Sequence, residues 1–125
     1  MLSGTPNVLG IVAVEEGVRL VAEAGVDRLR AKAVALTELA VELVDAELAP
    51  LGARLRSPRD ARVRGAHVTV EVPDARTVTD ELIARGVVPD FRNPDMIRLG
   101  LSPLTTTFEE TWTALDVLRD LLSSR

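Results

Sequence analysis

One short segment of this sequence, residues 67–72, constrains the fold more than any other, because its apolar and polar residues alternate strictly. The order His-Val-Thr-Val-Glu-Val places the three valines on one side of an extended strand and the polar residues on the other. Such a strand predicts a sheet with one face buried and one face exposed to water. The rest of the chain must then supply helices that cover the buried face.

Two helical segments precede this strand. The first is expected to begin with Thr5 as its N-cap and Pro6 as its first helical residue, and to end at Gly25. The second spans about 27–48 and is ended by a proline and a glycine. Its apolar residues recur at spacings of four and three along one face: Leu29, Ala33, Leu36, Ala40 and Leu43.

Two further helices follow the strand. The third is expected to start with Asp74 as its N-cap and to end near Gly86. Its inward-facing residues are Val78, Leu82 and Ile83. The fourth begins with the spacing of a capping box, Thr107 followed by Glu110 three residues later. Its apolar positions include Trp112, Leu115, Leu118 and Leu122.

Shorter segments complete the pattern. Further strands are expected at 53–56, 87–88 and 96–101, with a loop over 57–65 and polar turns at 89–90 and 93–95. The order helix, helix, strand, strand, helix, strand, helix indicates an α+β fold. We expect one domain over 1–125, with a small, mostly antiparallel sheet and helices packed on one of its faces.

Composition narrows the classes of function. The chain has 125 residues, 15 basic and 19 acidic, and only 2% of its residues are aromatic. This argues against nucleic-acid binding, which uses a basic face and stacking aromatics. Without cysteine and with one histidine, the chain has no disulfide and no typical zinc site. No segment resembles a membrane span or a signal peptide, so we expect a cytoplasmic protein.

Two places have the chemistry to hold an anion. Segment 3–6 precedes a helix whose backbone N–H groups, with the Thr5 hydroxyl, suit a phosphate, although an ordinary N-cap explains the same residues. Arg98 lies within an apolar strand, where a guanidinium can grip the carboxylate of an amino acid. The alternative is an edge-strand arginine that faces solvent or pairs with Asp95 or Glu71.

Other polar residues have simpler interpretations. Arg92 is expected to be a surface or loop-bracing residue, and His67 a structural one, because no nucleophile or orienting carboxylate is placed beside it. The glutamate pairs 15–16 and 109–110 are expected on helix surfaces. The sequence therefore assigns no catalytic residue and no metal ligand within this chain.

Five motifs occur in the order and spacing of one enzyme family. They are Gly4-Thr5-Pro6-x-Val8-Leu9, Leu29-Arg30-x-Lys32-x-x-x-Leu36-Thr37, Arg64-Gly65-x-His67-Val68, Gly86-Val87-Val88-x-Asp90-x-Arg92-x-Pro94 and Ile97-Arg98-x-Gly100-x-x-Pro103-Leu104. Over nearly its whole length the chain resembles the C-terminal small domain of kynureninases. These are enzymes of fold type I that depend on pyridoxal phosphate and are related to class V aminotransferases.

The resemblance implies a hydrolase that cleaves kynurenine to anthranilate and alanine in tryptophan catabolism and NAD biosynthesis. It implies a cytoplasmic homodimer, with pyridoxal phosphate as the cofactor of the full-length enzyme. Arg98 matches the arginine that binds the α-carboxylate of the substrate. Gly4 and Thr5 match a segment that approaches the cofactor phosphate or the substrate across the dimer interface.

The chain also departs from the family. Kynureninases usually have a tyrosine after Pro-Leu, whereas Thr105 follows Leu104 here, so we expect different packing near the Arg98 loop. The lysine, aspartate and aromatic residue that hold the cofactor belong to a large domain that this chain lacks. Lys32 is interpreted as part of a solvated helix face. The chain alone is therefore predicted to be inactive.

Two hypotheses for function remain. In the first, the chain is the small domain of a kynureninase, whose partner is the missing large domain or a second subunit. In the second, it is a free-standing, non-catalytic binding or dimerisation module derived from such an enzyme. The start of the chain directly at the Gly4-Thr5 motif favours the first. A cysteine desulfurase is less favoured, because those enzymes use a cysteine nucleophile and this chain has none.

Overall fold

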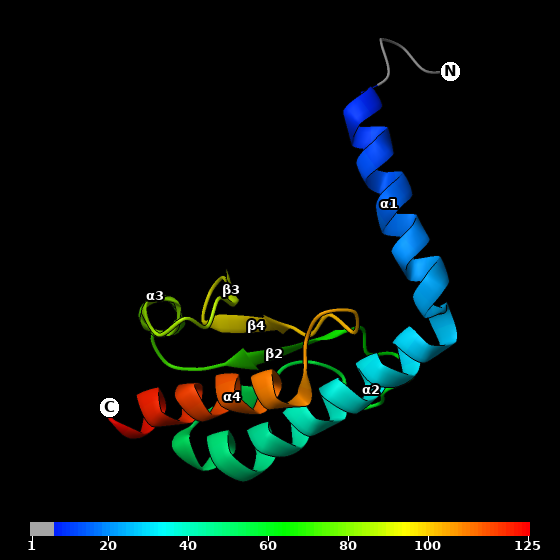
Figure 1. Ribbon diagram of the computed structural model, residues 1–125. Coiled ribbons are helices and arrows are strands. Elements are labelled where there is room, and N and C mark those ends of the chain that lie inside the picture. The colour runs from blue at the N-terminus through cyan, green and yellow to red at the C-terminus, as the bar shows by residue number, and fades with distance from the viewer. Residues whose placement is uncertain (1–6) are drawn as a thin grey trace.

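The computed structural model describes residues 7–125, and its helices and strands follow the expected order (Figure 1). The elements are α1 (Val8–Ala24), α2 (Val26–Leu43), a π-helical turn η1 (Val44–Leu48), a 3-10 turn η2 (Ala49–Leu51), β1 (Arg54–Leu55), β2 (His67–Glu71), α3 (Ala75–Ala84), β3 (Asp90–Arg92), β4 (Met96–Gly100) and α4 (Phe108–Ser123). Gly4 and Thr5 lie outside the described residues.

The four strands form one sheet in the order β1-β2-β4-β3, and every neighbouring pair is antiparallel. The two longest strands, β2 and β4, lie at its centre, with Val68 opposite Leu99 and Val70 opposite Ile97. Because side chains alternate along a strand, these four point to the same face of the sheet. The α+β fold with a small antiparallel sheet is confirmed.

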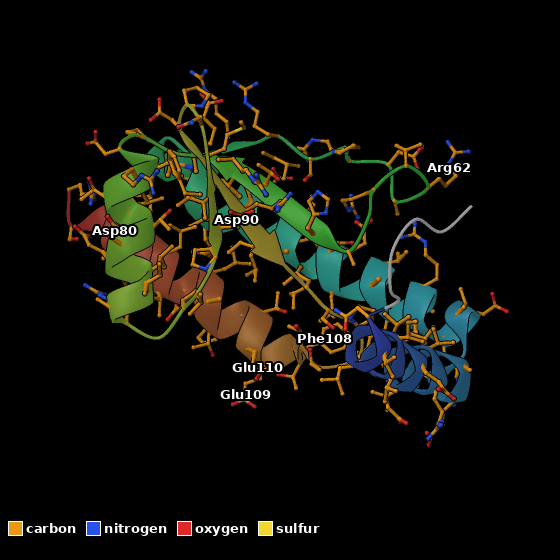
Figure 2. All side chains as sticks on the ribbon, turned by 90° about the horizontal axis from the view of Figure 1, so that it is seen from above. Arg62, Asp80, Asp90, Phe108, Glu109 and Glu110 are labelled. Atoms are coloured by element: carbon orange, nitrogen blue, oxygen red, sulfur yellow. The ribbon has the colours of Figure 1, made fainter. Side chains whose placement is uncertain are left out.

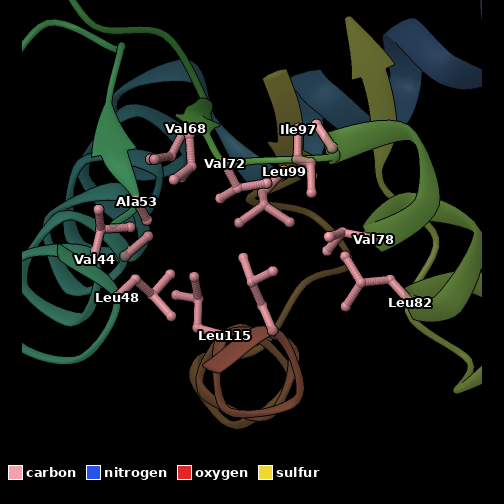
Figure 3. Close-up of a cluster of buried hydrophobic side chains, with 14 of the residues drawn as sticks. Val44, Leu48, Ala53, Val68, Val72, Val78, Leu82, Ile97, Leu99 and Leu115 are labelled. Carbon is pink, nitrogen blue, oxygen red and sulfur yellow. The ribbon is translucent and has the colours of Figure 1, made fainter. Parts of the chain in front are cut away.

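Helices α2, α3 and α4 cover that face and enclose the core (Figure 3). The fully buried side chains come from each of these layers: Leu36, Val44, Leu48, Val68, Val70, Val72, Val78, Leu82, Ile97 and Leu118. The opposite face of the sheet carries no helix of the described part of the chain, so its polar side chains reach solvent. The expected division into one buried and one open face is therefore confirmed.

Helix α1 stands apart from this body (Figure 1). Gly25 ends α1 as expected and joins it to α2 with φ 82°, a backbone conformation that glycine adopts without strain. No residue of Val8–Ala24 is buried within the described part of the chain. The cap differs from the prediction, since the side chain of Asn7, rather than that of Thr5, accepts the hydrogen bond from the Gly10 N–H, at 3.0 Å.

The expected strand at 87–88 is wrong, and strand β3 forms instead over residues 90–92, where the sequence suggested a turn at 89–90. The central residue of β3, Phe91, packs against the core, and the guanidinium of Arg76 lies 4.0 Å from the centre of its ring. One apolar residue between two charged ones is too short a pattern to reveal a strand. Strand β3 is instead defined by its antiparallel pairing with β4.

Two expected core positions are also exposed. Ile83 and Trp112 are 47% and 50% exposed, respectively. In α3, Val78 and Leu82 lie one turn apart, whereas Ile83 is rotated about 100° from Leu82 and away from the core. Asp74 occupies the N-cap position with φ 53°, but its side chain makes no capping bond.

Candidate functional site

Arg98 lies near the middle of the open sheet face. Its strand β4 runs between β2 and β3, where Arg98 stands opposite Thr69 on one side and Asp90 on the other. The adjacent Ile97 and Leu99 point into the core, so strand alternation turns the guanidinium outward. With its side chain 38% exposed, Arg98 is supported by the sheet and still open to solvent.

The carboxylate of Asp90 holds two arginines at once. Its Oδ2 atom lies 2.5 Å from Nη2 of Arg98 and 2.7 Å from Nη2 of Arg92. Asp90 is labelled over the sheet in Figure 2, which looks at the molecule from above. Two arginines and one aspartate leave the cluster with one excess positive charge. The cluster is therefore suited to attract an anion.

Arg98 also keeps unused donors. A guanidinium carries five N–H groups, and within residues 7–125 the only hydrogen bond of this side chain is the one from Nη2 to Asp90. The remaining N–H groups can bind a second carboxylate through two parallel hydrogen bonds. Asp90 fixes the orientation of the guanidinium in advance, which lowers the entropic cost of binding.

The structure excludes several of the alternatives considered for Arg98. The arginine is not on an edge strand, and its partner is neither Glu71 nor Asp95. The carboxylate of Glu71 pairs with Arg56, and among residues 7–125 the Arg98 guanidinium bonds only to Asp90. The sequence missed Asp90 as the partner because it did not foresee strand β3.

The other predicted site residues take different places. Arg92 lies on strand β3, with its side chain 51% exposed. His67 opens β2 opposite Gly100, on the same open face as Arg98, and its imidazole makes no hydrogen bond or ion pair with any described residue. Its interpretation as a structural residue stays a prediction. Gly4 and Thr5 cannot be placed relative to Arg98, because they lie outside the described residues.

A buried arginine escaped the sequence interpretation. The side chain of Arg64 is only 1% exposed; it pairs with Glu38 on α2 and donates to the carbonyls of Pro58 and Arg59 at 2.9 and 2.7 Å. In turn, Arg30 donates to the backbone carbonyl of Arg64 at 3.0 Å. These bonds hold loop 57–65 against α2. An arginine in a charged loop ordinarily suggests exposure, so only the folded loop reveals this role.

A hollow of about 620 Å³ lies between the segment before β3 and helix α4, and Arg98 does not line it. Val87, Val88 and Pro89 line one side, and Ala114 and Val117 line another. The segment that was expected to form a strand at 87–88 thus borders this hollow. It contains none of the predicted site residues.

Among residues 7–125, no group of histidine, cysteine, aspartate and glutamate side chains is arranged to hold a metal ion. No helix in that same stretch is both long enough and apolar enough to span a membrane.

The fold recurs within larger enzymes. The apo structure of a cysteine desulfurase from Thermococcus onnurineus NA1 matches 99% of this chain and 33% of its own, with a TM-score of 0.86 and 20% identity. A NifS-like protein matches 98% of this chain and 36% of its own, with a TM-score of 0.77 and 23% identity. The architecture thus defines a class of small α+β fold that makes up about a third of each of these two longer chains.

Sequence similarity identifies the family within this class. The model of the kynureninase C-terminal domain matches residues 29–118, and the chain belongs to that family. It is 39% identical over 124 residues to a kynureninase of Pseudomonas fluorescens and 32% identical over 122 residues to one of Geobacillus thermodenitrificans. The two matches include 99% and 98% of this chain, but only 30% and 28% of the length of the two relatives.

Proposed function

We propose that this chain works as the C-terminal small domain of a kynureninase, an enzyme that hydrolyses kynurenine to anthranilate and alanine. The observation that carries the proposal is Arg98, a half-exposed arginine on the open sheet face with one aspartate partner and unused N–H donors. Membership of the kynureninase C-terminal domain family supports kynurenine as the substrate. In this proposal Arg98 binds the α-carboxylate of kynurenine.

The cluster around Arg98 suits that role. Asp90 orients the guanidinium and neutralises one of the two arginine charges, so one net positive charge remains for one carboxylate. Strand β4 holds the backbone of Arg98 between two neighbouring strands, so the side chain starts from a rigid position. Gly4 and Thr5 are proposed to approach the cofactor phosphate, and Thr5 also the substrate.

Pyridoxal phosphate is proposed as the cofactor of the complete enzyme, where it supplies the electron sink for breaking the substrate bond. The described residues alone do not fit this group. The only lysine, Lys32, lies on α2 and lines a shallow hollow with Arg28 and Leu104. The cofactor must then bind mainly in the part of the relatives that this chain does not cover. Assembly as a cytoplasmic homodimer and a place in tryptophan catabolism and NAD biosynthesis belong to the same proposal.

The carboxylate role is tested in a chimera of the Pseudomonas fluorescens kynureninase, in which residues 1–125 replace the part that they match. Arg98→Ala is expected to raise KM for kynurenine about 10- to 100-fold, because charge-assisted hydrogen bonds contribute about 1.5–3 kcal/mol. The affinity for pyridoxal phosphate should change little.

Arg56→Ala serves as the matched control, since Arg56 pairs with Glu71 and lies outside the Asp90 cluster. It should leave both KM and cofactor affinity near those of the chimera. An equal loss of substrate and cofactor binding in Arg98→Ala, or no loss of either, contradicts the role of Arg98.

The second candidate function is a free-standing, non-catalytic binding or dimerisation module. The broad exposed apolar surface of α1 is consistent with a module that binds another protein. The two candidates differ in one result, since only the first predicts that the chain supports kynurenine hydrolysis when joined to the remainder of a kynureninase.

A further inference from the structure

Helix α1 exposes an unusual amount of apolar surface. Its large apolar residues are between 37% and 82% exposed: Val8, Leu9, Ile11, Val12, Val14, Val18, Leu20 and Val21. Single exposed apolar residues are common on proteins, but a contiguous apolar surface marks a site of interaction. The base of the helix meets the body at α2, and its other end projects away (Figure 1).

The apolar residues surround the beginning of the helix. Ile11, Val14, Val18 and Val21 recur at spacings of three, four and three, which places them in one stripe. A second line, about 110° around the helix from this stripe, begins with the apolar residues Val8 and Val12 and then carries Glu15 and Arg19, an ion pair at 3.7 Å. The first turns of α1 are therefore apolar all round, whereas its later turns are amphipathic.

A helix that is apolar on all sides is typical of a protein interior. The second half of α1, with one charged side, is instead typical of a helix that lies on the surface of its partner. The partner must therefore enclose the first turns and contact only one side of the later ones.

The comparisons place α1 within longer proteins. The family model of the C-terminal domain begins at residue 29, after α1, whereas the similarity to the Pseudomonas fluorescens kynureninase covers 99% of the chain. The structural match to the cysteine desulfurase also covers 99% of the chain, with a TM-score of 0.86, so it includes α1 in its projecting position. This position is thus part of a fold found inside chains about three times as long.

We propose that α1 is a docking helix for the remaining part of a kynureninase-length polypeptide. Its first turns insert into that part, and the stripe formed by Ile11, Val14, Val18 and Val21 lies on its surface. This inference rests on the proposed function, because the occupant is the region that this chain does not match, about 70% of the Pseudomonas fluorescens protein given the 30% that is covered.

Two other occupants fit the helix less well. A second copy of α1 would cover one stripe but leave the other sides of the first turns in water. A membrane surface would favour lysine and arginine on the polar side of the helix. That side carries Glu15, Glu16 and Glu23 against the single Arg19.

Cysteine labelling tests the proposal, because the chain itself contains no cysteine. Val14→Cys places a thiol in the apolar stripe, and Arg19→Cys places one on the charged side as a matched control. Each variant is treated with a maleimide, once in the 125-residue chain and once in the chimera with the Pseudomonas fluorescens kynureninase. Mass spectrometry of the α1 peptide then gives the rate of modification.

We expect Val14→Cys to react quickly in the 125-residue chain and at least tenfold more slowly in the chimera, while Arg19→Cys reacts at similar rates in both. Equal rates for Val14→Cys in the two proteins overturn the proposal. Protection that appears in the 125-residue chain as its concentration rises, or on addition of anionic phosphatidylserine vesicles, also overturns it, because the occupant is then a second copy or a membrane.

A second format covers the case of a chimera that does not fold. The 125-residue chain and the unmatched part of the Pseudomonas fluorescens protein are co-expressed as separate polypeptides and labelled in the same way. Lack of protection of Val14→Cys there contradicts docking. An active enzyme with an unprotected Val14→Cys contradicts docking alone, whereas protection in a folded chimera without kynurenine hydrolysis contradicts the proposed function alone.

Discussion

At the scale of single residues, two arginines of this chain have opposite surroundings. Arg64 is almost fully buried and bonds to Glu38 and to two backbone carbonyls, so its guanidinium is committed to holding a loop. Arg98 is 38% exposed and has one partner, Asp90, so most of its donors remain available. Arginine therefore stabilises the fold at position 64 and belongs to a candidate binding site at position 98.

This contrast predicts different effects of one substitution on stability. Arg64→Ala is expected to lower the free energy of unfolding by about 3 kcal/mol, because it removes a buried network and leaves carbonyl groups without partners. Arg98→Ala should lower it by less than about 1 kcal/mol, since it breaks only a partly exposed ion pair. Urea unfolding of the two variants measures both values. Similar losses in the two would contradict these assignments.

The surroundings of Arg98 could be predicted from the sequence better than those of Arg64. The sequence predicted a strand over 96–101 that contains Arg98, and in the structure the alternation of that strand turns Arg98 away from the core, because Ile97 and Leu99 point into it. Nothing comparable marks Arg64, whose burial depends on how the charged loop folds back onto α2. Asp90 was missed for a similar reason, since its position beside Arg98 follows from the pairing of β3 with β4.

At the scale of elements, helix α4 begins with the capping box that its sequence predicts. The Thr107 hydroxyl accepts from the Glu110 N–H at 3.0 Å, and the Glu110 carboxylate accepts from the Thr107 N–H at 2.8 Å. The hydrogen bonds from the Thr107 backbone and hydroxyl lower the pKa of Glu110 below its ordinary value. The ionised carboxylate therefore stabilises the start of α4.

A pH dependence follows from this lowered pKa. A carboxyl group whose pKa is lower in the folded state contributes stability above its unfolded pKa of about 4.3, and loses it as the pH falls through the folded value. Glu110→Gln should therefore reduce Tm at pH 7, and the difference from the parent chain should shrink below about pH 4.3. Thermal unfolding followed by circular dichroism across this range measures it. A difference that grows on acidification would refute the role of the ionised carboxylate.

Elements with long patterns were foreseen better than short ones. The alternation at 67–72 and the repeated spacing at 27–48 were sufficient for β2 and α2, because each is repeated many times. Strand β3 has only three residues, and its single apolar side chain, Phe91, carries no period. The exposure of α1 was likewise not foreseen, because an apolar helix ordinarily predicts a place in the core of the same domain.

At the scale of the whole molecule, the chain forms a core of its own but leaves two notable surfaces uncovered. Helices α2, α3 and α4 bury one sheet face, while Arg98 and α1 both present surfaces that no other described residue covers. The curated relatives are about three times as long as the matched region. The core is thus formed within this chain, whereas its proposed chemistry depends on a further part.

The 125-residue chain alone is therefore predicted to be inactive. It should neither take up pyridoxal phosphate through Lys32 nor cleave kynurenine, because this lysine lies on α2 beside a shallow hollow. The absorbance of lysine-bound cofactor and the fluorescence of released anthranilate measure the two properties. Cleavage by the chain alone would show that the groups assigned to the unmatched part are not required.

Anthranilate release by the chimera with the Pseudomonas fluorescens kynureninase tests the central claim most directly. If residues 1–125 work as the small domain of a kynureninase, the purified chimera forms anthranilate and alanine from kynurenine in equal amounts. A chimera that is folded and loaded with pyridoxal phosphate, yet releases no anthranilate, would contradict the claim.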